Sequence, residues 1–484
     1  EPKSNNIIWS PFSWFAMLAA ELHWSFVFGV VIVYGINQGL GGAFWGVSSK
    51  YYMKDVQKVQ PSEAQVYSGI TNIPWIVKPV WGIFTDLVPI FGYQRRPYFI
   101  LAGILGIIPM IFLSQYKDLP IVLALLFMTA GNASVAIADV TVDACVAQNS
   151  GTHPFLAADM QSMCALSSSI GSLLGFSISG ILVHWIGSQG VFGLLTIPAG
   201  LVLLVGLTLK ENQTSTLAYE QVSRKLITAA KAMWKTLKIP EVWKPCIYMY
   251  FSLSLSINIS EGMFYWVTDS SDGPQFSQET IGYILAVGSV GSLLGAILYQ
   301  NALKNYPFRD ILFWAQILSF ASGMLDLVLV LRLNLKLGIP DRLFVVADVS
   351  VSQMISRLMW MPLLVLSSKL CPPGIEGTFF ALLMSIDNAG TMTASWSGGL
   401  LLHVLSVTRT RFGRLWVGVL IRNVMRIAPL FLLFLVPRTD PNAALLPDSV
   451  MNPNGMMMMM MVGSSDDDDE EAQEFVNVEL ISLL

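Results

Sequence analysis

The chain has 484 residues, of which 54% are hydrophobic and 12% are charged, and its mean hydropathy is +0.59. Soluble domains carry about 25% charged residues, so a soluble surface would lack half of its usual charge. These values argue against a soluble enzyme, a nucleic-acid-binding protein and a disordered scaffold, and they favour a polytopic membrane protein. The net charge of −4 comes from the C-terminal end, because 10 of the 32 acidic residues but 1 of the 28 basic residues lie from Arg438 onward.

Apolar stretches of about 20 residues, the length that crosses a bilayer as a helix, recur along the chain. Small residues in the fifth and eleventh stretches suit close helix contacts in lipid. Twelve stretches predict an all-α polytopic membrane protein with transmembrane helices at 26–48, 62–83, 98–115, 119–143, 156–186, 190–208, 245–267, 279–300, 310–331, 343–367, 377–405 and 415–436.

A polar segment between the sixth and seventh stretches divides the chain into two six-helix halves. It carries seven basic residues, which by the positive-inside tendency places it on the cytoplasmic side or its topological equivalent. The spacing of its residues 222–237 favours an amphipathic helix at the membrane interface or, equally, a solvated linker helix. We therefore expect an N-terminal segment 1–25, an N-terminal half 26–208, a basic linker 209–244, a C-terminal half 245–437 and a disordered acidic tail 438–484.

Two short repeats indicate that the halves are duplicated. Residues 180–184 (GILVH) recur as 399–403 (GLLLH), at the ends of the fifth and eleventh stretches. The loop 82–96 begins with Gly and ends with Arg, as does its degenerate partner 295–309. In many transporters, duplicated halves enclose a substrate site near the middle of the membrane.

The loop after the second stretch contains Gly82, Asp86, Arg95 and Arg96. Gly allows close packing, Asp one turn later can cap or pair, and the two Arg residues anchor the loop at the membrane surface. This pattern resembles the loop signature of the major facilitator superfamily, which implies a gate that holds the halves in one state. Asp143, at the same end of its stretch, is within reach of Arg95 or Arg96 and is assigned to this gating group. The alternative is that both Arg residues are only topological anchors.

Several ionisable side chains lie inside the predicted stretches, where burial is costly and function is the default expectation. So many groups cannot all face lipid, which predicts a shared polar cavity. For any one of them, and above all for Asp143, Asp326 and Asp348, the alternative is a structural ion pair or a place at a helix end. The groups are Lys78, Asp139, Asp143, Glu261, Asp326, Asp348, Arg357, Asp387, Arg422 and Arg426.

Any transport would have to draw on a gradient, because the chain has no Gly-x-x-x-x-Gly-Lys-Ser/Thr loop for ATP. A carboxylate removed from water can bind and release a proton in the working pH range, and Asp139 and Glu261 are the candidates for proton coupling. The four Cys and four His residues lack ligand spacing, so we expect neither metal nor cofactor. No nucleophile and base are arranged as in an enzyme.

Four segments together resemble the folate-biopterin transporter family of the major facilitator superfamily. The likeness covers most of the chain, from about residue 29 to residue 438. It implies an origin in plants, cyanobacteria or protozoa, and we expect a plant member. It implies the twelve-helix fold and transport of folates or pterins driven by a proton gradient. The chain departs from the family pattern at one place. Just after the two aspartates of the fourth stretch, transporting members carry an acidic residue followed by a basic one, whereas this chain has Gln148-Asn149. The four segments are Pro74-Trp75-x-x-Lys78-Pro79, Gly92-Tyr-Gln-Arg-Arg-Pro-Tyr98, Asp139-Val-Thr-Val-Asp143 and Leu420-Ile-Arg-Asn423.

Such a substrate suggests roles for four residues. A pterin ring presents adjacent N–H donors that the Asp139 carboxylate can accept, and Lys78 and Arg357 can bind the anionic part of a folate. Trp75 can stack on the ring, although Trp residues more often serve as packing or as part of the interfacial belt. Two other functions fit the same fold: transport of another organic anion, and a membrane receptor that does not transport.

The acidic tail ends in Glu479-Leu-Ile-Ser-Leu483-Leu484. This matches a dileucine pattern that sorting adaptors bind, although such short patterns also occur by chance. A functional pattern would indicate an endomembrane or vacuolar address, while the plasma membrane and the plastid envelope stay open. The expected partners are thus a small-molecule substrate, protons, membrane lipid and a sorting adaptor, with no nucleic acid.

Overall fold

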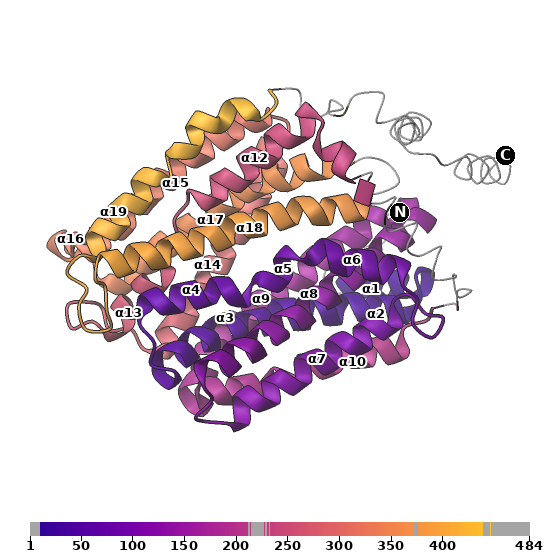
Figure 1. The fold of residues 1–484 in the computed structure, drawn as a ribbon, viewed down its shortest axis with the longest axis horizontal. Coiled ribbons are helices and arrows are strands. Elements are labelled where there is room, and N and C mark those ends of the chain that lie inside the picture. The colour runs from indigo at the N-terminus through magenta and orange to yellow at the C-terminus, as the bar shows by residue number, and fades with distance from the viewer. Residues whose placement is uncertain are drawn as a thin grey trace, which may run out of the picture.

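The computed structural model describes residues 10–211, 213, 227, 230–231, 233–371, 376–438 and 446. These residues are mostly helical, and none of them lies in a β-strand. The helices of residues 24–208 form one bundle, and those of residues 240–435 form a second bundle beside it (Figure 1). The predicted all-α fold with two helical halves is confirmed.

The first half begins after α1 (Ser10–Glu21). Its elements are α2 (Trp24–Val30), η1 (Val31–Leu40), α3 (Gly41–Tyr51), η2 (Tyr52–Val56), α4 (Pro61–Thr71), α5 (Ile73–Ile76), α6 (Lys78–Leu87), α7 (Arg96–Gln115), α8 (Ile121–Thr152), η3 (Pro154–Leu156), α9 (Ala157–Leu194) and α10 (Thr196–Thr208). The elements of the second half are α12 (Pro240–Ser254), α13 (Ser260–Asp269), α14 (Gln278–Leu298), η4 (Tyr299–Leu303), α15 (Phe308–Val330), α16 (Leu333–Lys336), α17 (Asp341–Lys369), α18 (Glu376–Val404), α19 (Leu415–Met425) and η5 (Ala428–Leu435).

Eight segments of the described chain are long and apolar enough to cross a bilayer. They cover nine of the twelve predicted stretches, because Asp159–Thr208 contains two of them on either side of Gly187. Gly187 has φ +71°, a conformation that side chains disfavour, and it interrupts the helix there. Stretches 62–83 and 245–267 are each broken into shorter helices. Stretch 377–405 forms the long helix α18, in which many Gly, Ser and Thr residues lower the hydropathy.

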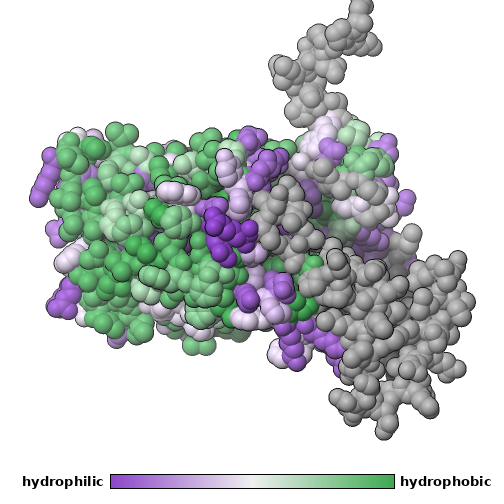
Figure 2. Space-filling model, turned by 90° about the horizontal axis from the view of Figure 1, so that it is seen from above, coloured by the Kyte–Doolittle hydropathy of each residue, from purple (hydrophilic) through white to green (hydrophobic). Residues whose placement is uncertain are grey.

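The surface between the two ends of the bundles is hydrophobic. Figure 2 shows a broad area of hydrophobic side chains on one face, with hydrophilic side chains at its left end and toward its right end. Val122, Trp314 and Phe431 are among the exposed apolar residues. An exposed apolar area of this extent is expected where helices face lipid.

The two halves are in close contact at one end of the molecule. We call the end with α1 and the start of α12 the linker end, and the opposite end, with α13 and α16, the far end (Figure 1). At the far end, Lys50 of α3 pairs with Glu261 of α13 at 2.5 Å, and Lys54 of η2 pairs with Asp269 of α13 at 2.7 Å. Both ion pairs join the first half to the second.

The repeated glycines of the sequence lie at equivalent contacts between the halves. A Cβ atom on Gly180 of α9 would lie 2.2 Å from the carbonyl oxygen of Gln278, at the start of α14. A Cβ atom on Gly399 of α18 would lie 2.8 Å from the carbonyl oxygen of Ser62, at the start of α4. Only glycine permits so close a backbone approach, and the duplicated motif therefore supplies two matched helix crossings.

The second repeat also makes matched contacts, each within one half. Arg96 Nε donates to the carbonyl oxygen of Gly206 at 3.1 Å, near the end of α10. Arg309 Nε donates to the carbonyl oxygen of Val436 at 2.9 Å, just after η5. In each half, an Arg at the start of one helix, α7 or α15, thus binds carbonyl groups that are left free at the end of the last helical element of that half, α10 or η5.

Candidate functional site

The second predicted stretch is a broken helix, and the break positions the candidate site. Pro74 and Pro79 lie in the first turns of α5 and α6, where proline removes backbone donors and interrupts the helical ladder. The Asn132 amide donates to the carbonyl oxygen of Thr71 at 2.8 Å, and the Asn388 amide of α18 donates to that of Trp75 at 3.2 Å. Side chains of α8 and of the other half thus bind carbonyl groups in the interrupted region, as membrane interiors require.

Lys78, the first residue of α6, forms the centre of a buried charged group. Its Nζ lies 2.5 Å from Asp139 and 3.2 Å from Asp143, both on α8. The Gln38 amide donates to Asp139 at 2.7 Å, and the Tyr34 hydroxyl donates to Asp143. Lys78 and Asp139 are buried, whereas the side chain of Asp143 is 43% exposed. The group contains one cation and two carboxylates. A ligand can therefore take the place of one carboxylate next to Lys78 while the other carboxylate stays paired with that lysine.

Asp143 therefore lies with Asp139 rather than in the loop after α6. Its reach toward Arg95 or Arg96 predicted a place in the gating group. In the described chain its polar contacts are with Lys78 and Tyr34. Any part that Asp143 has in gating would have to act through Lys78.

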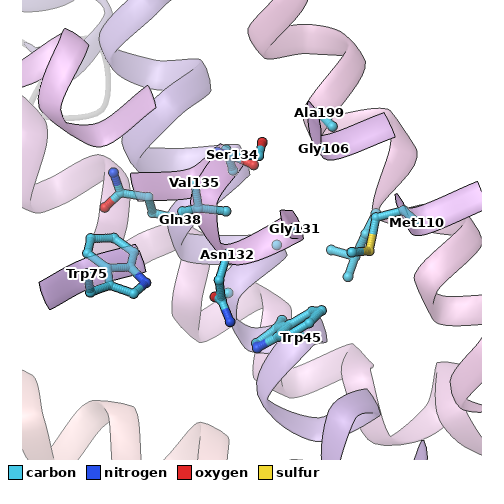
Figure 3. A pocket seen from close by; sticks show the side chains of 14 residues that line it. Gln38, Trp45, Trp75, Gly106, Met110, Gly131, Asn132, Ser134, Val135 and Ala199 are labelled. Atoms are coloured by element: carbon cyan, nitrogen blue, oxygen red, sulfur yellow. The ribbon is translucent and has the colours of Figure 1, made fainter. Parts of the chain in front are cut away.

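A pocket of about 250 Å³ opens next to this charged group, inside the first half. Trp45 and Trp75 provide aromatic walls, and Gln38 and Asn132 provide amide groups (Figure 3). The side-chain nitrogen of Asn37, which also lines the pocket, is buried without a hydrogen-bond partner in the described part of the chain. The pocket can therefore hold a flat ring between aromatic surfaces and offer it hydrogen bonds.

Arg357 of α17 lines a second pocket, of about 390 Å³, between the two halves. The walls come from α9 of the first half and from α14 and α17 of the second, and they carry several Ser side chains and Gln353. Arg357 Nε is buried and has no hydrogen-bond partner among the described residues. A guanidinium without a counter-ion, in a pocket that also has hydroxyl and amide groups, is suited to bind an anion.

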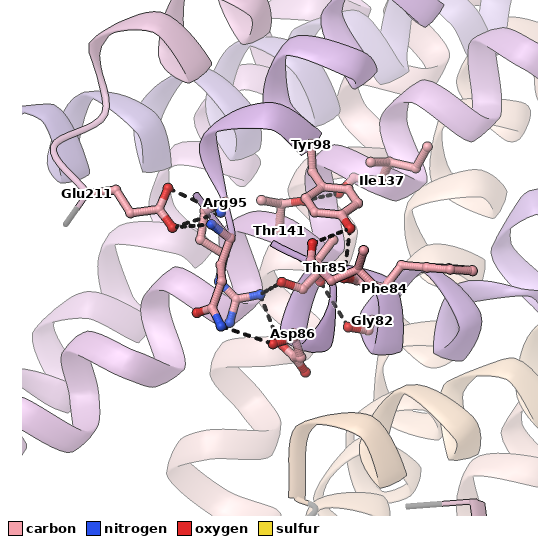
Figure 4. A network of polar contacts seen from close by, with 11 residues as sticks. Gly82, Phe84, Thr85, Asp86, Arg95, Tyr98, Ile137, Thr141 and Glu211 are labelled. Carbon is pink, nitrogen blue, oxygen red and sulfur yellow. Dashed lines mark hydrogen bonds and ion pairs between the residues drawn. The ribbon is translucent and has the colours of Figure 1, made fainter. Parts of the chain in front are cut away.

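The loop after α6 forms a compact polar network (Figure 4). Arg95 Nη1 lies 2.7 Å from Asp86 Oδ1 and donates to the carbonyl oxygen of Thr85 at 2.9 Å. The Glu211 carboxylate, after α10, accepts hydrogen bonds from the backbone N–H groups of residues 94–96 at 2.7 to 3.0 Å. The predicted pairing of acid and base is thus present, and it ties α6, α7 and the end of α10 together within the first half.

The C-terminal half buries a second charged cluster. Arg422 Nη2 of α19 lies 2.6 Å from Asp326 Oδ2 of α15, and the Ser352 hydroxyl donates to Asp348 at 3.4 Å. Arg426 donates to the carbonyl oxygen of Ser319 at 3.1 Å. The two Arg contacts join α19 to α15, and the hydroxyl groups of Ser322 and Ser352, 2.7 Å apart, join α15 to α17. This packing fits the structural alternative given above for Asp326 and Asp348.

Tyr34, Gln38, Glu211 and Lys50 are among the residues that were not singled out from the sequence. Tyr34 and Gln38 lie one turn apart in the first stretch and are uncharged, so the rarity of charge inside a membrane does not mark them. Glu211 lies in the basic linker, where an acid suggests a solvated surface. Lys50 lies at the end of a stretch, where a lysine is usually a membrane anchor. A search for polar residues four apart on one helix face would have found the first two.

Comparison with known proteins identifies the chain. The model of the BT1 family matches residues 38–446. The chain belongs to the BT1 family. It is 62% identical to "Probable folate-biopterin transporter 2" of Arabidopsis thaliana over 93% of this chain and 90% of that protein. It is 32% identical to "Folate-biopterin transporter" of Synechocystis sp. over 88% of this chain and 84% of that protein. The resemblance inferred from the sequence is therefore confirmed, and the chain is a multi-pass membrane transporter of plant type, not an enzyme.

Solved transporter structures share the fold. A mutant of the nucleoside transporter NupG matches with a TM-score of 0.62 at 12% identity, over 85% of this chain and 98% of that chain. The D-xylose-proton symporter matches with a TM-score of 0.59 at 14% identity, over 87% of this chain and 98% of that chain. The expected major facilitator fold is thereby confirmed. The sorting pattern at Glu479, Leu483 and Leu484 and residues 214–226 of the linker lie outside the described residues.

Proposed function

We propose that this BT1 family protein transports folates or pterins by alternating access and couples their movement to protons. The observation that carries the proposal is the charged group around Lys78, which adjoins an aromatic pocket with amide groups through the shared residue Gln38. Relatives named as folate-biopterin transporters support the substrate class.

The two parts of a folate would bind to different features. The pocket of about 250 Å³ lies below the usual range for small-molecule sites, roughly 300 to 1,000 Å³, so it suits one ring rather than a whole folate. The pterin ring would lie against Trp75, with Asp139 accepting its N–H donors. Lys78 or Arg357 would bind the carboxylates of the glutamate part.

The lysine contacts also suggest how protons would be coupled to movement. Protonation of Asp139 would weaken its contact with Lys78 and free that lysine for an anion. Protonation of Glu261 would weaken its contact with Lys50 and loosen the far end. The loop of Gly82, Asp86, Arg95 and Arg96 makes its contacts within the first half, so it would act in gating by holding that half rigid while the halves move.

Uptake into proteoliposomes tests this proposal. The purified chain should take up labelled folate or biopterin above the level of protein-free liposomes, and an imposed pH gradient should increase the initial rate. Lys78→Ala should reach the membrane and lose uptake, while Lys117→Ala, at an exposed loop lysine, should match the wild type. Uptake equal to that of protein-free liposomes would refute the proposed substrates. Unchanged uptake by Asp139→Asn would refute the role of that residue.

A further inference from the structure

Asp387, within α18, is a buried carboxyl group with no partner. It is 1% exposed, and neither side-chain oxygen has a hydrogen-bond partner in the described part of the chain. It takes part in none of the ion pairs found there. Asp139 and Glu261 differ from Asp387 in this respect, because each of them lies 2.5 Å from a lysine.

Within the described part of the chain, the helices next to α18 supply no positive charge to Asp387. A Cβ atom on Gly390, one turn further along α18, would lie 2.8 Å from the carbonyl oxygen of Tyr250 of α12. The titratable group that α12 brings near Asp387 is the Cys246 thiol. The other elements packed against α18 are α4, α5, α6, α17 and α19, and no charged group on them acts on Asp387 within the described chain.

An ionised carboxylate is not stable in such a place. Burial of a charge without a counter-ion or hydrogen bonds is so costly that the group becomes neutral instead. A thiol supplies no compensating charge. Asp139 and Glu261 each have a lysine as counter-ion, whereas Asp387 has none among the described residues. Asp387 is therefore a carboxyl that holds a proton in this conformation.

Asp387 also lies where the two halves meet. The next residue, Asn388, donates to the carbonyl oxygen of Trp75 at 3.2 Å, across the boundary between the halves. Trp75 lines the pocket of the first half. A movement of α18 away from α5 would break this hydrogen bond and change the surroundings of the adjacent carboxyl group.

We propose that Asp387 carries one of the coupled protons, an inference that rests on the proton coupling of the proposed function. In the conformation closed at the far end, Asp387 is a neutral acid. When α18 moves and water reaches the group, the carboxyl O–H bond breaks, the proton passes to water and a carboxylate remains. Proton uptake from the opposite side restores the acid. Asp139 and Glu261 keep their proposed roles in releasing Lys78 and Lys50.

Infrared spectroscopy of the full chain at neutral pH tests the protonation directly. The wild type should show the carbonyl band of a protonated carboxyl group that Asp387→Asn lacks. Asp310→Asn, at a 43% exposed side chain at the start of α15, should leave the band in place. Identical spectra for the wild type and Asp387→Asn would overturn the inference. Asp387→Ser provides a second neutral replacement in case the Asn side chain does not fit.

Transport in proteoliposomes tests the coupling. Asp387→Asn should retain exchange of labelled folate at equal pH on both sides, and it should lose the stimulation by a pH gradient and the folate-driven movement of protons. Stimulation equal to that of the wild type would overturn the inference. A wild type that transports folate equally with and without a gradient would overturn proton coupling and, with it, the coupling role of Asp387. A wild type without folate uptake would overturn the proposed substrate, and the infrared difference would still decide whether Asp387 is protonated.

Discussion

Replacement of Lys78 by Met tests whether the buried charged group stabilises the fold. Met keeps an unbranched side chain, one atom shorter than Lys, but removes the charge that lies 2.5 Å from Asp139 and 3.2 Å from Asp143. The variant leaves two carboxylates without their shared cation. The side chain of Asp139 is 9% exposed and that of Asp143 is 43% exposed, so most of the cost falls on Asp139.

The structure also sets the size of the effect. Removal of one partner from a buried ion pair costs about 3 to 5 kcal/mol. Asp139 keeps its hydrogen bond from Gln38, and Asp143 keeps the one from Tyr34. We therefore expect a loss in the free energy of unfolding near the lower end, about 3 kcal/mol. In the double variant Lys78→Met/Asp139→Asn no fully buried carboxylate of this group is left unpaired, so it should recover most of the loss.

Thermal unfolding in detergent measures this order. The wild type should be the most stable, the double variant should come next, and Lys78→Met should be the least stable. Lys117→Met, at an exposed lysine in the loop between α7 and α8, should melt with the wild type. A double variant no more stable than Lys78→Met would refute the reasoning, because it would mean that the lost packing, and not the unpaired carboxylate, destabilises the protein.

Two further predictions concern the contacts between the halves. Lys50→Met should remove the charged hydrogen bond to Glu261, worth about 1.5 to 3 kcal/mol, and open the far end. Spin labels at positions 58 and 271, one in each half, should then lie further apart than in the wild type. An unchanged distance would contradict this prediction. Gly180→Leu should lower transport at least tenfold, because its Cβ would lie 2.2 Å from a carbonyl oxygen. Gly200→Ala, which meets open space, should transport at the wild-type rate, and equal rates for the two variants would show that the close crossing is not needed.

Much of the fold could be predicted from the sequence because hydropathy and repetition are strong signals. Long apolar stretches have few stable forms other than membrane helices, and the duplicated GILVH and GLLLH segments marked the two halves. The break at the prolines around Trp75 was not predicted, because the second stretch was expected to be one span. A polar cavity with Lys78 and Asp139 among its candidate groups followed from the rarity of charge inside membranes, but their pairing did not.

The partners of the charged groups were harder to predict, because they depend on how helices rotate and cross. Asp143 was placed with Arg95 by its depth in the membrane, whereas the rotation of α8 turns it toward Lys78. Glu211 binds three backbone N–H groups, a role that nothing in its linker context indicates. Asp387 could be recognised as buried from its stretch, but its lack of a partner is a property of the packed structure alone.

The pocket beside Lys78 has one more consequence. All of the residues that line it belong to the first half, so a rigid rotation of one half against the other would leave its walls in place. The residues that bind the ring would then differ from the residues at the contact between the halves, which determine the side of the membrane to which the pocket opens. A substitution at Trp45 or Asn132 could alter which heterocycle is accepted without changing how the protein opens, and the specificity of such a chain could diverge independently of its mechanics.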